Sequence, residues 1–515
     1  MDTTTIGVRI GALAFVCAAC GGAGPADEPA PTASDEARAA GGEARAEATP
    51  PAEGAEETRS PASDPRIAEA IRWELRADPA VGADRVAVEV EDGIATLRGS
   101  APHLRMVDRA VDRARMIWGV RGVVSLVHVD ERDRSDPAIA AAVRNALLID
   151  PAAEAAELSV SVQDGELTLG GTVGSYAERR HAERTARAVS GVRAVDNMIE
   201  VASTTDRPDE EILADVEASL RADRWIDEWL LSARVEDGVV ELDGVQPTAW
   251  AAERARRAAH VMGTEDVAAS IRVEPFMARE MRRPPAGYQY PDDETIHRWV
   301  QRAIDRDPRV FRAEMDVDFV APSATVILQG IVQSMDAMDA AEETALNVRG
   351  VREVDNRLVV DADPDDAHLS ARIRRAFETH PAIQDASIEA VVDDGHVTLD
   401  GSVDALYTKL AAEDAVRRIP GVTGVDNTID APAPIPTAGM DDYVLRQQIR
   451  NRLRFHPYVD GAGIDVDVTD GSAVLTGTVD DWRSERSAIE AAYAAGATRV
   501  IDGLGIERGP HRRAP

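Results

Sequence analysis

The feature that most constrains this chain is a short pattern that recurs six times. Its regular form is an Asp-Gly pair, an apolar run and a second glycine six positions after the first. The first glycines are Gly93, Gly165, Gly238, Gly395 and Gly471, and the second glycines are Gly99, Gly171, Gly244, Gly330, Gly401 and Gly477. The copy at Gly330 has Ala321-Pro322-Ser323 in place of Asp-Gly. A period of roughly 70 to 75 residues predicts an array of small domains.

Each copy opens with apolar residues spaced four apart, such as Ile67, Ile71 and Leu75, which predicts an amphipathic helix. An Asp-Pro or His-Pro pair is expected to stop this helix, because proline disfavours helical structure in the residue before it. The third copy has Asp223-Arg224 at this place, which predicts a less sharp end. Alternating apolar residues around Asp-Gly then predict a β-hairpin with a type I′ turn. The recurrent aspartates are therefore interpreted as turn residues, and the second glycine as the end of the second strand.

A second helix ending near glycine and a third alternating strand complete each copy. The predicted fold class is α+β, with six tandem α-β-β-α-β domains, each a small sheet with two helices on one face. The expected domains span 64–131, 135–203, 207–275, 292–362, 364–431 and 441–508, with linkers at 276–291 and 432–440. The first linker is interpreted as a hinge between two triplets of domains.

The N-terminal segment predicts export. The apolar run from Ile10 to Ala19 is too short to span a bilayer but suits a signal peptide over residues 1–20. Ala18-Ala19-Cys20-Gly21-Gly22 resembles a lipoprotein box, which predicts lipidation at Cys20; the alternatives are an unlipidated secretory signal or a misassigned start. Residues 21–63 are rich in Ala, Pro, Glu and Gly and predict a disordered tether. Gly21 after the cysteine favours the outer membrane.

Composition argues against several classes of function. The net charge of −35 makes nucleic acid an unexpected partner. Cys17 and Cys20 are the two cysteines, so the repeats hold no disulfide, Cys-ligated zinc or thiol nucleophile. No hydrolase or phosphate-loop motif is present, and His380 and His456 occupy helix-stop positions. We expect a protein that is not an enzyme and has no cofactor and no metal site, although a small-molecule site between repeats would leave no signature in the sequence.

Two copies show a family resemblance most fully. The second reads Asp164-Gly165-Glu166-Leu167-Thr168-Leu169-Gly170-Gly171-Thr172-Val173 and later Gly191-Val192-Arg193-Ala194-Val195-Asp196-Asn197. The fifth reads Asp394-Gly395-His396-Val397-Thr398-Leu399-Asp400-Gly401-Ser402-Val403 and later Gly421-Val422-Thr423-Gly424-Val425-Asp426-Asn427. The pattern resembles the BON domain of bacterial envelope proteins. The resemblance implies a non-enzymatic periplasmic or outer-membrane module linked with phospholipid binding, envelope integrity and osmotic stress.

The second helices of the first three copies are basic. Nine arginines are candidates for phospholipid headgroup contact: Arg105, Arg109, Arg113, Arg179, Arg180, Arg184, Arg254, Arg256 and Arg257. Each basic side chain near an anionic surface contributes about 1 kcal/mol to binding. The alternative is that these arginines are ordinary solvated residues paired with Glu178, Glu183 and Glu253. Two partners therefore stay open: a membrane, reached by the lipid anchor and by headgroup contact, or envelope proteins bound by a repeat scaffold.

Overall fold

The computed structural model describes residues 63–506 apart from 79–80, 82–84, 131–133, 150–157, 203–206, 278–280, 283, 311–313, 322, 364, 381–382, 385, 432–440 and 481. The predicted signal peptide, the lipidation site Cys20, the tether up to residue 62 and the linker 432–440 lie outside these residues. By its internal contacts, the chain from Glu57 to Pro515 is one compact unit.

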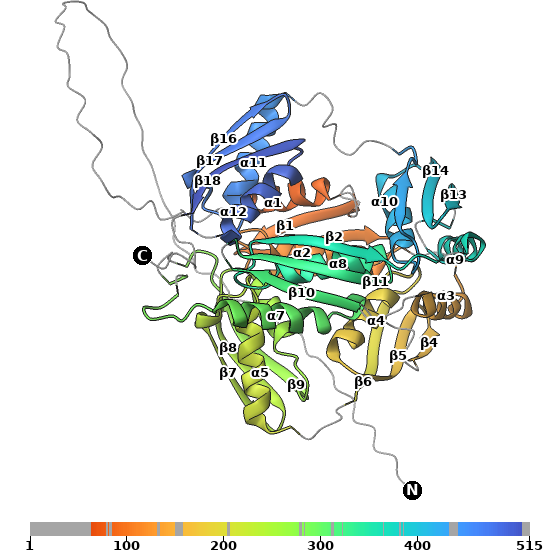
Figure 1. Cartoon of the computed structure of the whole chain (residues 1–515), viewed down its shortest axis with the longest axis horizontal. Coiled ribbons are helices and arrows are strands. Elements are labelled where there is room, and N and C mark those ends of the chain that lie inside the picture. Colours follow the sequence, from red (N-terminus) through yellow and green to blue (C-terminus); the bar gives the residue numbers. More distant parts are fainter. Residues whose placement is uncertain are drawn as a thin grey trace, which may run out of the picture. The chain divides into compact units, whose positions relative to one another are not determined.

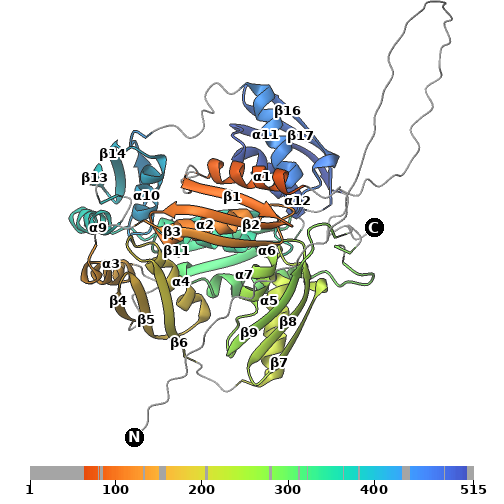
Figure 2. The ribbon, with the colours of Figure 1, turned by 180° about the vertical axis from the view of Figure 1, so that it is seen from behind.

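Each repeat has the order helix, strand, strand, helix, strand (Figure 1). Repeat 1 consists of α1 (Asp64–Ala77), β1 (Val86–Glu91), β2 (Ile94–Ala101), α2 (Leu104–Arg115) and β3 (Gly122–Val129). The middle strand β2 pairs antiparallel with β1 and parallel with β3. All six sheets have this order, and helices cover one face of each sheet (Figure 2). The α+β fold class with six α-β-β-α-β domains is therefore confirmed.

The other five repeats follow the same plan. Repeat 2 consists of α3 (Asp136–Ile149), β4 (Leu158–Gln163), β5 (Glu166–Val173), α4 (Tyr176–Arg187) and β6 (Ala194–Val201). Repeat 3 consists of α5 (Asp209–Ala222), η2 (Glu228–Leu230), β7 (Leu231–Glu236), β8 (Val239–Gln246), α6 (Ala249–Ala258) and β9 (Asp266–Val273). Repeat 4 consists of α7 (Asp293–Asp305), η3 (Pro308–Val310), β10 (Glu314–Val320), β11 (Thr325–Val332), α8 (Met335–Leu346) and β12 (Glu353–Val360). Repeat 5 consists of α9 (Asp366–Thr379), β13 (Ser387–Asp393), β14 (His396–Ser402), α10 (Leu406–Arg417) and β15 (Gly424–Asn427). Repeat 6 consists of α11 (Asp442–Phe455), η4 (Gly461–Gly463), β16 (Ile464–Thr469), β17 (Ser472–Val479), α12 (Trp482–Ala494) and β18 (Arg499–Ile506).

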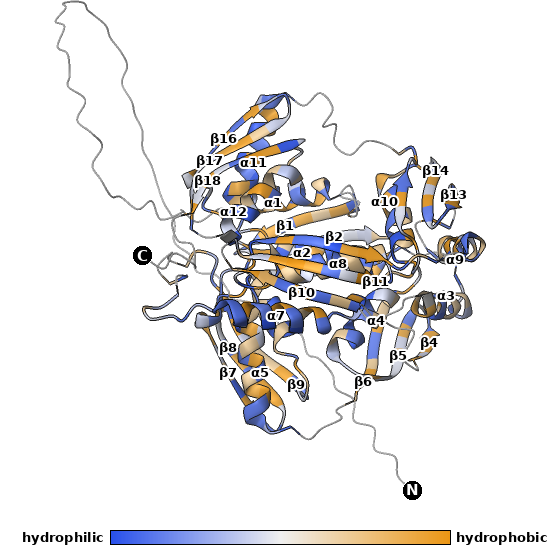
Figure 3. Ribbon diagram, viewed as in Figure 1, coloured by the Kyte–Doolittle hydropathy of each residue, from blue (hydrophilic) through white to orange (hydrophobic). Residues whose placement is uncertain are grey.

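The core of each repeat lies between its helices and its sheet. In repeat 1 the predicted stripe of Ile67, Ile71 and Leu75 is at most 1% exposed and packs with Leu97 of β2. Apolar and polar residues alternate along the strands, as the colours in Figure 3 show. Each core consists mainly of Val, Ile, Leu and Ala, with few aromatic residues. A core this small buries limited apolar area, so contacts between repeats contribute to stability.

The hairpin turn of each regular repeat is held by its first helix. Asp92 and Gly93 have φ of 50° and 75°, the positive values that a type I′ turn requires. The carboxylate of Asp64 accepts hydrogen bonds from the backbone N–H groups of Asp92 (2.9 Å) and Gly93 (3.1 Å). The corresponding carboxylates in repeats 2, 3, 5 and 6 are those of Asp136, Asp209, Asp366 and Asp442. The sequence analysis did not identify this contact.

The second glycine lies inside the middle strand. Gly99 belongs to β2, which continues to Ala101, so the expectation that this glycine ends the strand was wrong. Its φ is 137°, and a Cβ at this position would lie 1.9 Å from the carbonyl oxygen of Arg85. The neighbouring backbone therefore crosses the strand at a distance that only glycine permits.

The first helix of repeat 3 ends as sharply as the others, contrary to expectation. Helix α5 ends at Ala222, and the next residue, Asp223, is extended with ψ of 119°. Asp78 after α1 is also extended, with ψ of 105°. In repeat 3 the carboxylate of Asp223 accepts hydrogen bonds from the backbone N–H of Trp225 and from Nε of Arg254. These bonds favour the extended conformation without proline.

Helix contacts join repeats 1 and 6, 3 and 4, and 2 and 5. The backbone N–H of Trp118, after α2, donates to the carbonyl oxygen of Phe455, the last residue of α11 (3.0 Å). In the same way, Arg349 after α8 donates to Ala222, the last residue of α5 (2.7 Å). Repeat 1 is thus joined to repeat 6, and repeat 4 to repeat 3. Helix α3 of repeat 2 likewise contacts α9 of repeat 5.

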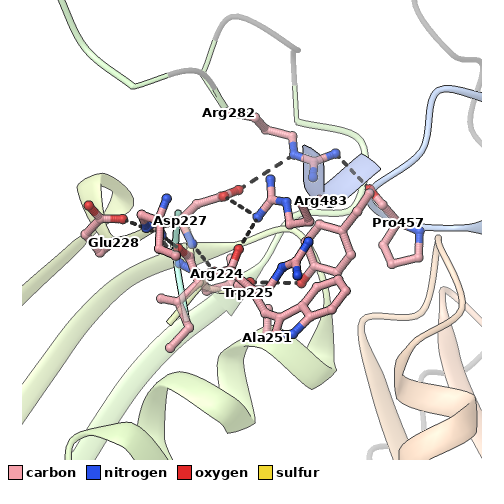
Figure 4. Close-up of polar contacts among 12 residues, drawn as sticks. Arg224, Trp225, Asp227, Glu228, Ala251, Arg282, Pro457 and Arg483 are labelled. Atoms are coloured by element: carbon pink, nitrogen blue, oxygen red, sulfur yellow. Dashed lines mark hydrogen bonds and ion pairs between the residues drawn. The ribbon is translucent and has the colours of Figure 1, made fainter. Parts of the chain in front are cut away.

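The segment between repeats 3 and 4 packs against three repeats. The Nε1–H of Trp118 donates to the carbonyl oxygen of Pro275 (2.7 Å), and Arg282 Nη1 donates to that of Pro457 (3.0 Å). The buried carboxylate of Asp227 lies 3.2 Å from Arg483 Nη1 and 3.8 Å from Arg282 Nε (Figure 4). These contacts connect repeats 1, 3 and 6 through the linker, so the predicted hinge is attached to its neighbours along its described length.

Candidate anion-binding site between the repeats

The second helices face other repeats. Arg187 of α4 forms hydrogen bonds of 2.7 and 2.6 Å with the two carboxylate oxygens of Asp108 on α2. Arg417 of α10 is paired in the same way with Asp339 on α8. Asp108 and Asp339 are each the fifth residue after the N-cap of their helix. The same contact therefore joins repeats 1 and 2 and repeats 4 and 5, and it places the basic helices between domains.

Five of the nine candidate arginines are engaged within their own repeats. Arg109 and Arg113 both donate from Nε to Oδ2 of Asp78, each at 2.7 Å. Arg254 pairs with Asp223 at 2.5 Å, and Arg256 with Glu253 at 2.6 Å. Arg179 Nη2 donates to the carbonyl oxygen of Asn197 at 2.7 Å. The contacts of Arg109, Arg113 and Arg254 hold the second helix against the end of the first helix, and that of Arg179 holds it on the third strand. The Arg256–Glu253 pair lies within α6.

The pKa of Asp78 shows how strongly the paired arginines act on their carboxylates. Burial raises the pKa of Asp78, which is 4% exposed, but its bonds to Arg109 and Arg113 outweigh burial and hold the pKa below its usual value. The Asp223–Arg254 ion pair, at 2.5 Å, is as close as the pairs of Asp78, which are 2.7 Å long. These arginines are therefore structural residues of their repeats.

The other four candidates form what we call the arginine row, made of Arg105, Arg180, Arg184 and Arg257. Among the described residues, none of the four has a carboxylate within 4 Å of its guanidinium group. Arg184 Nη2 lies within hydrogen-bonding distance of Nδ1 of His181, at 3.2 Å. Of the nine candidate arginines, the four in the row therefore keep their positive charge available to a ligand.

Members of the row lie close to one another across repeat boundaries. Desolvation by the surrounding repeats and then the positive charges of Arg418 and Arg184 lower the pKa of Arg105 to about 10. Desolvation and then Arg257 and Arg184 lower the pKa of Arg180, also to about 10. Arg180 and Arg184 are exposed side chains of α4, and desolvation by nearby protein atoms is the first cause of the lowered pKa of each. Repulsion of this kind favours binding of an anion.

One histidine lies beside the row. The Nδ1 atom of His260 is buried and has no hydrogen-bond partner among the described residues. Burial, followed by the charges of Arg256 and Arg180, lowers its pKa to about 4. Its ring stacks against Tyr176 of repeat 2, with ring centroids 4.5 Å apart. The imidazole is therefore neutral at pH 7 and has one ring nitrogen available for a ligand.

The described residues contain no group of three or more His, Cys, Asp or Glu side chains placed to hold a metal ion. Within the described helices, none is long and apolar enough to cross a membrane. The arginine row is the feature that the charges and the packing single out.

A mixed three-stranded sheet with two helices on one face, repeated six times, defines a protein built from small tandem α+β modules. The chain belongs to the BON domain family. The family model matches residues 63–131, 135–203, 208–275, 292–362, 365–432 and 441–508. The resemblance seen in the sequence is confirmed.

Two curated relatives are similar to part of the chain. The outer membrane lipoprotein DolP of Haemophilus influenzae is 29% identical over 140 residues, which cover 26% of this chain and 72% of DolP. The osmotically-inducible protein Y of Escherichia coli is 31% identical over 119 residues, which cover 22% of this chain and 59% of the relative. The C-terminal domain of CdsD, the structural protein of the type III secretion system of Chlamydia trachomatis, aligns over 41% of this chain and 96% of its own, with 14% identity. Its TM-score of 0.11 adds nothing to the assignment.

Sequence reasoning missed the residues that surround the row. His260, Tyr176 and Arg306 come from repeats 3, 2 and 4 and have no counterparts at equivalent positions in the other copies. A repeat pattern reveals residues that recur, so residues used once, at one junction, leave no signal in it.

Proposed function

We propose that this chain is a non-enzymatic protein of the cell envelope that binds anionic phospholipid headgroups and so supports membrane integrity or osmotic-stress tolerance. The observation that carries the proposal is the arginine row: in a chain with a net charge of −35, these four guanidinium groups have no carboxylate partner among the described residues. The names of the two relatives, an outer membrane lipoprotein and an osmotically-inducible protein, support the envelope and the stress response. Lipidation at Cys20 and an outer-membrane location are parts of the same proposal.

The placement of the row refines how headgroups are bound. Because α2, α4 and α6 face neighbouring repeats, the arginines meet a ligand in the spaces between domains. Headgroups that project from a membrane, or single lipids, reach such spaces, whereas a flat bilayer surface contacts the outer faces of the repeats. The five paired arginines contribute to the fold, and the row contributes to binding.

The test is co-sedimentation of the Glu57–Pro515 unit with neutral and anionic liposomes across a salt series. The decisive variant is R105Q/R180Q/R184Q/R257Q. Its matched control, R234Q/R272Q/R374Q/R499Q, removes four exposed arginines elsewhere and changes the net charge equally. We expect salt-sensitive binding to anionic liposomes that falls about tenfold or more in the row variant and less than about twofold in the control. Equal binding by the two variants would show that the row is not the lipid site.

A second candidate function is a protein-interaction scaffold in the envelope. It is favoured by the repeated contact of Asp108 with Arg187 and of Asp339 with Arg417, since these pairs show that the second helix is a surface on which another BON domain docks. Absence of liposome binding in the unaltered protein, together with capture of a purified BON-domain protein at high salt, would favour this function over lipid contact.

A further inference from the structure

A large cavity lies where repeats 2, 3 and 4 meet. Its volume is about 1550 Å³, enough for a ligand of several tens of non-hydrogen atoms. The walls come from the start of α4, strand β6, the segment after α6, and the end of α7 with η3. The cavity exists because three repeats pack together, so no single BON domain contains it.

Three guanidinium groups that have no carboxylate of the described residues within 4 Å line this cavity. Arg180 comes from repeat 2, Arg257 from repeat 3 and Arg306 from repeat 4. Desolvation lowers the pKa of each of these arginines. Each repeat therefore contributes one such guanidinium group to the wall of the same cavity, where nearby protein atoms strengthen electrostatic interactions relative to bulk water.

The carboxylates in the wall do not neutralise these three charges. Asp209 accepts the turn amides of its own hairpin, Asp307 accepts hydrogen bonds from Arg309, and Glu178 accepts one from Ser175. The other acidic wall residues are all exposed: Glu200, Asp237, Glu265 and Asp305. Arg180 and Arg306 are exposed as well, and in the described part of the chain no ion pair joins either of them to these carboxylates.

The cavity also has an apolar wall. Met198 on β6 is 63% exposed, and Met262 after α6 is 59% exposed, although methionine is usually buried. Both side chains line the cavity together with Val310 and Val261. Flexible thioether side chains adapt to apolar ligands of different shape. A cationic wall beside an apolar wall is complementary to an amphiphile with an anionic head.

We propose that this cavity binds one phosphate-bearing amphiphile, with Arg180, Arg257 and Arg306 contacting the phosphate group and Met198 and Met262 contacting the apolar chain. Three guanidinium groups carry more positive charge than the single negative charge of a ligand carboxylate. They suit a phosphate monoester, whose charge at pH 7 is between about −1.5 and −2. The free Nδ1 of His260, beside Arg180, completes the polar set. This inference rests on the proposed function and deepens it, because it assigns the headgroup to one cavity that holds a single molecule.

The experiment is isothermal titration of the Glu57–Pro515 unit with three probes below their micelle concentrations. Dodecyl phosphate carries both chemical features, inorganic phosphate carries the head alone, and dodecyl maltoside carries the chain with a neutral head. We expect one dodecyl phosphate per chain, with inorganic phosphate bound at least about tenfold more weakly and dodecyl maltoside more weakly still. Equal affinity for inorganic phosphate and dodecyl phosphate would overturn the amphiphile and leave a free-phosphate site.

Two double variants assign the contacts. R180Q/R257Q is expected to weaken dodecyl phosphate binding at least about hundredfold, since each lost charged hydrogen bond weakens binding by about tenfold or more. M198S/M262S is expected to weaken dodecyl phosphate several-fold and to leave inorganic phosphate binding unchanged. The control R234Q/R272Q removes two exposed arginines on the strands of repeat 3 and should change neither affinity. Full affinity in R180Q/R257Q would overturn the site.

A third variant separates this inference from the proposed function. R105Q/R184Q alters the two members of the arginine row that do not line the cavity. We expect it to retain dodecyl phosphate binding and to lose part of the affinity for anionic liposomes. If the unaltered protein ignores liposomes but binds dodecyl phosphate at the cavity, the membrane-surface function fails and the site stands. If liposomes bind and dodecyl phosphate does not, the site fails and the function stands.

Discussion

Arg187 and Asp108 lie 79 positions apart in the chain and form a two-pronged ion pair between repeats 2 and 1, and Arg417 and Asp339 form the corresponding pair between repeats 5 and 4. The contact occurs at the same helix positions in both halves of the array. Repeats within a half therefore dock by a shared rule, in which one second helix presents a carboxylate and the next presents a guanidinium group.

This rule predicts a measurable coupling between the two charges. D108N and R187Q should each destabilise the unit slightly, and a double-mutant cycle should give a coupling energy of about 1 kcal/mol, because both side chains are partly exposed. The charge-swapped variant D108R/R187D should recover most of the loss. Urea unfolding monitored by circular dichroism measures each free energy. A coupling energy of zero would show that the pair is incidental to docking.

Substitution of the crowded glycine in the middle strand is expected to lower the free energy of unfolding strongly. Gly99→Ala places a Cβ 1.9 Å from the carbonyl oxygen of Arg85, and φ is 137°. We expect a loss of at least about 3 kcal/mol in the free energy of unfolding. Gly287→Ala is the control, since φ there is 86° but no atom lies within 4 Å of the added Cβ. Strain alone should cost about 1 kcal/mol in the control. Thermal unfolding compares the two, and equal losses would contradict steric crowding as the cause.

The carboxylate that holds each hairpin turn predicts a local effect. Asp136→Ala removes the acceptor of the backbone N–H groups of Asp164 (2.9 Å) and Gly165 (3.0 Å). We expect repeat 2 to lose about 1 to 3 kcal/mol and the Gly165 amide to exchange faster with solvent. Asp196→Ala, at an exposed position on β6, should change neither quantity. Hydrogen exchange resolved to this turn is the measurement, and unchanged protection of Gly165 would disprove the role.

The ion pairs of Asp78 predict sensitivity to acid. Its pKa is held low in the folded protein, so the carboxylate stabilises the fold above the unfolded value of 3.8, and this contribution disappears as pH falls through the folded pKa. D78N should destabilise the unit by about 3 kcal/mol at pH 7, because it leaves Arg109 and Arg113 beside a neutral group. The deficit should begin to shrink as pH falls below 3.8, where the unfolded chain takes up the proton, and should be lost below the lowered pKa of the folded protein. Unfolding free energies at pH 7 and pH 3 test this.

Two histidines predict a second pH dependence, in a higher range. Burial, with positive charge from Arg256 near His260 and from Arg418 near His380, lowers both pKa values to about 4 from 6.5. Between pH 4 and 6.5 the unfolded chain binds more protons, so these residues make stability rise with pH across this window. H260Q/H380Q should flatten that part of the stability profile relative to the unaltered protein. Identical profiles would contradict burial of the neutral rings.

The sequence was sufficient to predict the fold of one repeat. The spacing of Ile67, Ile71 and Leu75 identified the first helix, and Asp92-Gly93 identified the hairpin, because both signals depend on local geometry. The role of Asp64 was also present in the sequence. An aspartate recurs 28 residues before the turn aspartate in five repeats, but this signal becomes visible only when positions are compared across the copies.

The arrangement of the repeats could not be predicted. Trp118 and Phe455 lie in different repeats, and nothing in either segment identifies the other as its partner. The same limit applies to the nine basic residues. A helical pattern shows that Arg109 and Arg180 are polar, but whether each meets a carboxylate of its own repeat or a neighbouring repeat depends on packing between domains. Tertiary contacts decided which arginines kept their charge available.

The contact between the first and last repeats has a mechanical consequence. Glu74 of α1 pairs with Arg452 of α11, and the guanidinium group of Arg452 also lies 4.6 Å from the ring of Trp73. A force applied at the two ends of the array therefore acts first on this junction and reaches the other repeats only after it opens. When the array is pulled from its two ends, the contact between repeats 1 and 6 must break first. Extension therefore begins with this single rupture rather than with gradual separation of successive repeats.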